Sequence, residues 1–159
     1  MTSKQYLGAV VQAGSVGFDT ARTVEKMHDL CSDAAKTGAK VVVFPEAFIG
    51  GYPKGLTFGA TIGSRNQVGR DEFAQYFNGS ITVPGKVTQE IGKTARKNNL
   101  FIVIGVIERD MGTLYCTVLS FDNKGNYLGK HRKVMPTSLE RIIWGFGDGS
   151  TLPVYNTEF

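Results

Sequence analysis

The chain has 159 residues, of which 42% are apolar and 20% are charged, and its formal net charge is +4. This length is typical of one domain, and the composition is that of a globular protein, not of a disordered or collagen-like one. No apolar run is long enough to cross a bilayer, and residues 1–5 lack the pattern of a secretion signal. The basic residues gather only at 93–97 and 130–133, so the sequence favours binding to neither nucleic acid nor a membrane.

The cysteines and histidines are few and scattered. Two of each, far apart in the sequence, predict neither a disulfide framework nor a metal site. Cys31 falls on the apolar face of a predicted helix and Cys116 in the middle of a predicted strand, so we interpret both as packing residues. Free thiols are typical of a reducing compartment, and we expect a cytoplasmic protein.

The first third of the chain alternates between strand and helix patterns. Residues 6–13 predict a strand, and residues 20–37 predict a helix capped by Asp19, with apolar positions at helical spacing. The apolar run 41–44 is typical of a strand buried on both faces, and Pro45 ends it.

A glycine- and aromatic-rich stretch separates this part from the next helices. Residues 47–68 predict a long structured loop, and loops of this length are uncommon unless they have a function. Its aromatic part, residues 48–58, is expected to shape a substrate pocket. A short helix is predicted over 69–77, and Pro84 is expected in the first turn of the following helix.

The remainder of the chain predicts mainly strands. Strands are expected over 100–107 and 113–121, followed by a turn at 122–125 and a return strand that starts at 126–129. A short helical pattern follows at 138–143. The order of elements predicts a layered α/β domain in which the helices cover one face of a sheet.

Glu46 is the first candidate for chemistry. It follows the buried strand 41–44 at its carboxyl end, where active sites of open α/β sheets gather. Its position is also compatible with a second interpretation, in which Glu46 is a loop glutamate paired with a nearby cation. Glu140 is ambiguous in the same way, since Arg141 follows it and offers a local ion pair.

Four consecutive basic residues, 130–133, form the second candidate region. Because side chains alternate along a strand, His131 and Lys133 are expected to face inward while Lys130 and Arg132 reach solvent. An inward lysine can stabilise negative charge that develops during a reaction. The alternatives are a solvated basic face and an anion-binding or regulatory module.

Two long segments carry a family resemblance. Residues 38–53 read GAKVVVFPEAFIGGYP, and residues 129–151 read GKHRKVMPTSLERIIWGFGDGST. Together they resemble the two signature regions of the nitrilase branch of the carbon–nitrogen hydrolase (nitrilase/cyanide hydratase) family. The resemblance extends over the whole chain and implies an incomplete α–β–β–α sandwich. Residues 1–159 would then be a single partial domain, the N-terminal half of the family fold.

The resemblance also implies a Glu–Lys–Cys catalytic set that needs no cofactor. By this resemblance Glu46 is the general base, Lys133 stabilises the transition state and Glu140 is a supporting carboxylate. The family's nucleophilic cysteine follows the second region on a further strand, which residues 1–159 do not reach. The implied reaction converts a nitrile to a carboxylic acid and ammonia, or to an amide if it stops at hydration.

We therefore expect the isolated chain to be inactive, and several roles stay open. It is either a fragment of an ordinary nitrilase or a shortened, non-catalytic paralogue that co-assembles with full-length subunits. Aromatic nitriles, aliphatic nitriles and hydrogen cyanide all remain candidate substrates, and a cyanide hydratase would give formamide. Because buried strands would keep an uncovered apolar face, we expect a homo-oligomer or association with full-length subunits.

Overall fold

One mixed sheet organises the computed structural model, which describes residues 5–159. Residues 1–4, on which the expectation about a secretion signal partly rests, lie outside the described residues. The first three strands pair in parallel and the last three antiparallel, in the order β1-β2-β3-β4-β5. The strands are β1 (Gly8–Val10), β2 (Val41–Val43), β3 (Phe101–Asp110), β4 (Thr113–Phe121) and β5 (Tyr127–Arg132).

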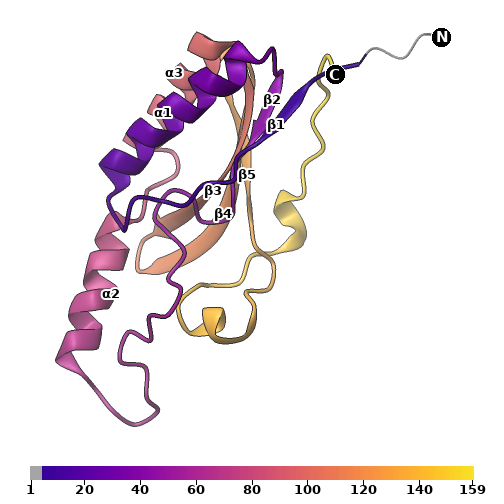
Figure 1. Cartoon of the computed structure of the whole chain (residues 1–159). Coiled ribbons are helices and arrows are strands. Elements are labelled where there is room, and N and C mark those ends of the chain that lie inside the picture. Colours follow the sequence, from indigo (N-terminus) through magenta and orange to yellow (C-terminus); the bar gives the residue numbers. More distant parts are fainter. Residues whose placement is uncertain (1–4) are drawn as a thin grey trace.

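Two helices, α1 (Thr20–Lys36) and α3 (Lys86–Asn98), lie together on one face of the sheet (Figure 1). Their apolar positions pack on the strands and exclude water, the main stabilising contribution to a core of this kind. This arrangement confirms the prediction that helices cover one face. The fully buried members of this core include Met27, Cys31, Ile91, Ala95, Ile102, Ile104 and Leu119.

The third helix, α2 (Gln67–Gly79), belongs to a second apolar cluster. Tyr76 of α2 stacks on Phe58 of the long loop, and its hydroxyl accepts a hydrogen bond from the indole of Trp144. Residues 47–58 are thereby fixed between α2 and the C-terminal segment. The helix is longer than the predicted 69–77 because the Asn66 side chain caps it by accepting from the Gly69 amide.

The helix boundaries test two sequence predictions. Asp19 caps α1 by accepting from the Arg22 amide at 3.0 Å, as predicted. Pro84 was expected in the first turn of α3, and this prediction is wrong. The N-cap is Gly85, whose amide donates to the Thr88 hydroxyl, so Pro84 stands outside the helix.

The strand boundaries differ mainly at β3, which was predicted to end at Ile107. It continues to Asp110 because the hairpin with β4 pairs Asp110 with Thr113. Conversely, β1 is shorter than the predicted 6–13, since its partner β2 offers only three residues for pairing. The helical pattern near 138–143 forms a 3₁₀-helix, η1 (Ser138–Ile142), and a second one, η2 (Gly149–Thr151), follows.

The opposite face of the sheet carries the C-terminal segment and is only partly covered (Figure 1). Val10 is 84% exposed and Val43 is 38% exposed, although both lie in strands. Val103 and Val118 continue this apolar surface along the neighbouring strands and line a cavity on it. None of the helices in the described residues is both long and apolar enough to span a membrane.

Candidate active site

Glu46 is held at the carboxyl end of β2 by close contact with β3. The peptide at residues 45–47 crosses directly over Gly105, where an added Cβ would lie 2.3 Å from the Pro45 carbonyl oxygen and 2.8 Å from Glu46 Cα. The Ile49 amide then donates to the Gly105 carbonyl at 3.1 Å. Glycine at position 105 is therefore what allows the backbone of Glu46 to approach the sheet.

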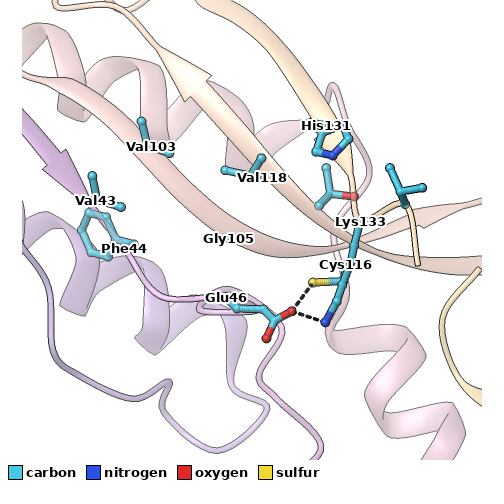
Figure 2. A pocket seen from close by; sticks show the side chains of 11 residues that line it. Val43, Phe44, Glu46, Val103, Gly105, Cys116, Val118, His131 and Lys133 are labelled. Carbon is cyan, nitrogen blue, oxygen red and sulfur yellow. Dashed lines mark hydrogen bonds and ion pairs between the residues drawn. The ribbon is translucent and has the colours of Figure 1, made fainter. Parts of the chain in front are cut away.

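Lys133 follows β5 directly and reaches Glu46 from the other side of the site. Its amide donates to the Cys116 carbonyl at 2.8 Å, which fixes its backbone to β4. Its Nζ lies 2.7 Å from Glu46 Oε1 and 2.8 Å from Glu140 Oε2 (Figure 2 shows the first pair). The structure thus brings together all three site residues that the sequence singles out.

Glu140 is the most enclosed of the three, and it comes from η1. Its Oε2 also accepts from the Thr137 amide at 2.6 Å, and its Oε1 accepts from the Tyr52 hydroxyl at 2.7 Å. The alternative of a local pair with Arg141 is wrong, because the Arg141 guanidinium donates to the Pro136 carbonyl.

The contacts within the trio shift the pKa values of Lys133 and Glu140. Burial by itself lowers the pKa of Lys133, but hydrogen bonds and attraction from Glu140 and Glu46 outweigh it and raise that pKa. Burial by itself raises the pKa of Glu140, but hydrogen bonds from Lys133, Tyr52 and the Thr137 amide outweigh it and lower that pKa. An ammonium flanked by two carboxylates is therefore the stable form near neutral pH.

A cavity of about 500 Å³ opens beside this trio on the partly covered face of the sheet. Glu46 and Lys133 lie at its edge, and valines from β2, β3 and β4 form its walls (Figure 2). His131 also lines it, in agreement with the alternation expected along β5. An apolar cavity with a few converging polar groups is typical of a small-molecule site.

The aromatic loop contributes less to this site than the sequence predicts. Phe48 is buried against Phe44 and Phe58 packs on α2, so both belong to the core. Tyr52 alone of these loop aromatics bonds to the trio, and its ring packs edge-on against Trp144 at 5.6 Å. Phe48 and Tyr52 nevertheless line, together with Glu46, a second cavity of about 370 Å³, so the expectation that residues 48–58 shape a pocket holds for this first part of the loop.

Cys116 is the site neighbour that sequence reasoning missed. It is 6% exposed, as expected of a packing residue, but its thiol lies 3.4 Å from Glu46 Oε1 (Figure 2). The register of the hairpin pairs Val118 with His131, so its continuation sets Cys116 opposite Lys133. A bulge between Ser120 and Phe121 shifts this register by one residue, and the sequence does not reveal it.

The expectation that Lys130 and Arg132 reach solvent is wrong. Both side chains instead bind Glu108 of β3, whose side chain is 1% exposed. Arg132 forms two hydrogen bonds with Glu108, at 2.7 and 2.9 Å, and its guanidinium stacks on the Tyr115 ring. With these two and Lys133 neutralised by carboxylates, the structure argues against an anion-binding module at 130–133. No group of three metal-ligating side chains is assembled anywhere in residues 5–159.

Tyr52 offers a direct check of the contacts around Glu140. The hydrogen bond to Glu140, then burial, raises the pKa of the Tyr52 phenol. Because Glu140→Gln removes the negative charge, we expect the Tyr52 pKa to fall towards the ordinary value for tyrosine. NMR titration of the chain labelled at its tyrosine ring carbons measures this, with Tyr52→Phe assigning the signal. An unchanged titration in Glu140→Gln would contradict the contact.

Comparison with known proteins identifies the family. Residues 8–159 match the carbon–nitrogen hydrolase family. The chain belongs to this family. It is 58% identical over 148 residues to a bifunctional nitrilase/nitrile hydratase from Nicotiana tabacum and 55% identical over 148 residues to nitrilase 2 from Arabidopsis thaliana. These matches cover 93% of the chain but 42% and 44% of the two relatives, so this carbon–nitrogen hydrolase chain spans less than half of their length.

Solved structures show the same fold. An amidase from Nesterenkonia sp. matches with a TM-score of 0.63 at 17% identity, over 89% of this chain and 48% of the amidase. A carbon–nitrogen hydrolase from Helicobacter pylori G27 matches with a TM-score of 0.63 at 20% identity, over 91% of this chain and 46% of the other. These likenesses confirm the α/β class, and the helix layer with its single sheet fits an incomplete α–β–β–α sandwich.

Proposed function

We propose that residues 1–159 provide the general base and the cation of a nitrile-hydrolysing site whose cysteine nucleophile lies outside them. Glu46 is the base, Lys133 stabilises charge on the substrate nitrogen, and Glu140 holds the lysine. The observation that supports this is the placement of Lys133 Nζ between the two carboxylates, at 2.7 and 2.8 Å, on the edge of an apolar cavity. The two plant relatives named above, both described as nitrilases, indicate the substrate class.

The proposed chemistry uses each group for one task. A nitrile carbon is a weak electrophile, so the attacking atom is a thiolate, formed as Glu46 accepts the thiol proton. Attack gives a thioimidate, and Lys133 stabilises the negative charge that develops on its nitrogen. Addition of water, activated by Glu46, and loss of ammonia leave a thioester. A second water then releases the carboxylic acid and the thiol.

The cysteines of the chain do not fit the role of nucleophile. Cys31 is fully buried on the inner face of α1, and burial raises the pKa of its thiol to about 12. Burial, followed by the neighbouring charge of Glu46, also raises the pKa of Cys116. Since the reactive species is the thiolate, both thiols are poor nucleophiles near neutral pH.

The product is either an acid or an amide. Hydrolysis through the thioester gives the acid, whereas loss of the thiol from the hydrated intermediate gives the amide. The bifunctional name of the relative from Nicotiana tabacum, nitrilase/nitrile hydratase, favours a mixture. An assay of this proposal therefore follows both ammonia and amide.

A chimera tests the proposed function. Residues 1–159 are joined to the part of the Nicotiana relative that follows the matched region, and the chain alone is assayed beside it. With aromatic nitriles, aliphatic nitriles and cyanide, we expect the chimera to release ammonia or amide and the chain alone to release neither. A folded but inactive chimera would contradict the proposal, as would turnover by the chain that survives removal of both cysteines.

The partly covered face of the sheet also favours association of the chain with other protein chains. Val10 and Val43 leave apolar surface exposed along β1 and β2, and such surfaces promote contact between chains. We propose that the chain forms homo-oligomers or binds full-length subunits of its family. Size-exclusion chromatography of the chain, alone and mixed with the full-length Nicotiana relative, distinguishes these assemblies from a monomer.

A further inference from the structure

Cys116 touches both principal members of the site. Its carbonyl oxygen accepts from the Lys133 amide at 2.8 Å, and its thiol donates to Glu46 Oε1 at 3.4 Å (Figure 2). One residue in the middle of β4 makes both contacts, and this strand pairs along its whole length with β3. Cys116 pairs with Ile107 of β3 on one side and accepts from the Lys133 amide on the other, so contacts made from it are well suited to fix a side chain.

The two oxygens of Glu46 have different surroundings. Oε1 meets both Lys133 Nζ, at 2.7 Å, and the Cys116 thiol. No group within residues 5–159 donates to Oε2. A carboxylate with one oxygen engaged twice is restrained from rotating about its last bond, and its other oxygen then points in a defined direction.

We propose that Cys116 is a positioning residue for Glu46, whose Oε1 it holds so that Oε2 is the atom that accepts the proton of the nucleophile. This inference rests on the proposed function, in which Glu46 is the general base. The proposal assigns Cys116 a role beyond packing in the core.

A buried thiol suits this task because it stays protonated. Burial, then the charge and hydrogen bond of Glu46, raise the pKa of Cys116, while Lys133 opposes the shift. The thiol is therefore a donor across the physiological pH range. As a weak donor it orients the carboxylate with little loss of basicity. Cys31 provides the contrast, since it is equally buried but lies within the helix-covered core, away from the site.

Alkylation of the chain with iodoacetamide tests the contact. Peptide mass spectrometry follows Cys116 and Cys31 in the same sample, so Cys31 reports any general loosening. Because Glu46→Gln removes a negative charge beside the thiol, we expect Cys116 to react about tenfold faster. Lys133→Met removes the opposing positive charge and should slow the reaction of Cys116.

The outcomes separate the contact from disruption of the fold. The proposal is supported if Cys116 is alkylated faster in Glu46→Gln and more slowly in Lys133→Met, while the alkylation rate of Cys31 stays constant in both variants. An unchanged rate at Cys116 in Glu46→Gln, or a faster rate in both variants, would overturn it. Glu90→Gln, on the exposed surface of α3, is the matched control and should change neither rate.

Kinetics of the chimera test the positioning role. Cys116→Ala is expected to lower kcat by about three- to tenfold, the usual contribution of one hydrogen bond, at unchanged KM. Cys116→Ser restores a donor and should recover most of kcat, while Cys31→Ala leaves it unchanged. Equal kcat in Cys116→Ala and the parent would overturn the proposal. An inactive parent chimera would instead overturn the proposed function, and the alkylation result would still decide the contact.

Discussion

Replacing Glu46 by glutamine or Lys133 by methionine is expected to lower kcat/KM of the chimera by at least about 10²-fold. General-base catalysis contributes about 10²–10⁴-fold, and one group that stabilises developing charge contributes about 10²–10³-fold. Each replacement also removes half of the 2.7 Å pair that holds the other side chain in place. Steady-state release of ammonia or amide measures the loss.

Matched variants show whether the loss is specific. Lys93→Met removes an exposed lysine that pairs with Glu90 on α3 and should leave kcat/KM unchanged. The double variant of Glu46 and Lys133 should lose little more than either single one, because groups that act as a unit are not additive. A loss below tenfold in a folded single variant would remove that residue from the catalytic set.

The sequence predicted the positions of the candidate residues well where local patterns decide the geometry. The apolar run before Pro45 places Glu46 at the carboxyl end of a parallel strand, and strand alternation turns Lys133 and His131 towards the cavity. These are short-range consequences of chain periodicity. The contact between Glu46 and Lys133, however, joins residues 87 positions apart, and the family resemblance, not the pattern, indicated it.

The parts that the sequence did not predict depend on pairing between distant strands. The bulge after Ser120 determines that Cys116, not a neighbour, lies opposite Lys133. The Arg132 side chain binds Glu108, which the predicted strand 100–107 left outside β3. Because β3 continues to Asp110, Glu108 lies within the strand. Local propensity carries no information on either register, since both follow from which strands meet.

The carboxylate of Glu108 gives the largest expected effect on stability. Its side chain is 1% exposed and accepts from Lys130, Arg132 and the Thr117 hydroxyl. Burial by itself raises the pKa of Glu108, but these hydrogen bonds outweigh it and lower that pKa. Glu108→Ala would leave the partly buried Lys130 without a partner and Arg132 with Asp110 alone, and breaking a buried pair in this way typically costs about 3–5 kcal/mol.

Urea unfolding of the chain measures this cost. Trp144 is the single tryptophan and is buried, so its fluorescence reports the transition at a fixed protein concentration. Asp33→Ala breaks an exposed pair with Lys36 on α1 and serves as the control, with no change expected. A midpoint for Glu108→Ala equal to that of the parent would show that the buried pairing does not stabilise the fold.

The pH dependence of the free energy of unfolding distinguishes the contribution of the Glu108 charge from that of its side-chain packing. Because its folded pKa lies below the unfolded value of about 4.3, its contribution is fully present above that value and is lost as pH falls through the folded pKa. Glu108→Gln should therefore reduce the acid-induced loss of stability relative to the parent. If the two acid profiles coincide, the glutamate stabilises the sheet by packing and not through its ion pairs with Lys130 and Arg132.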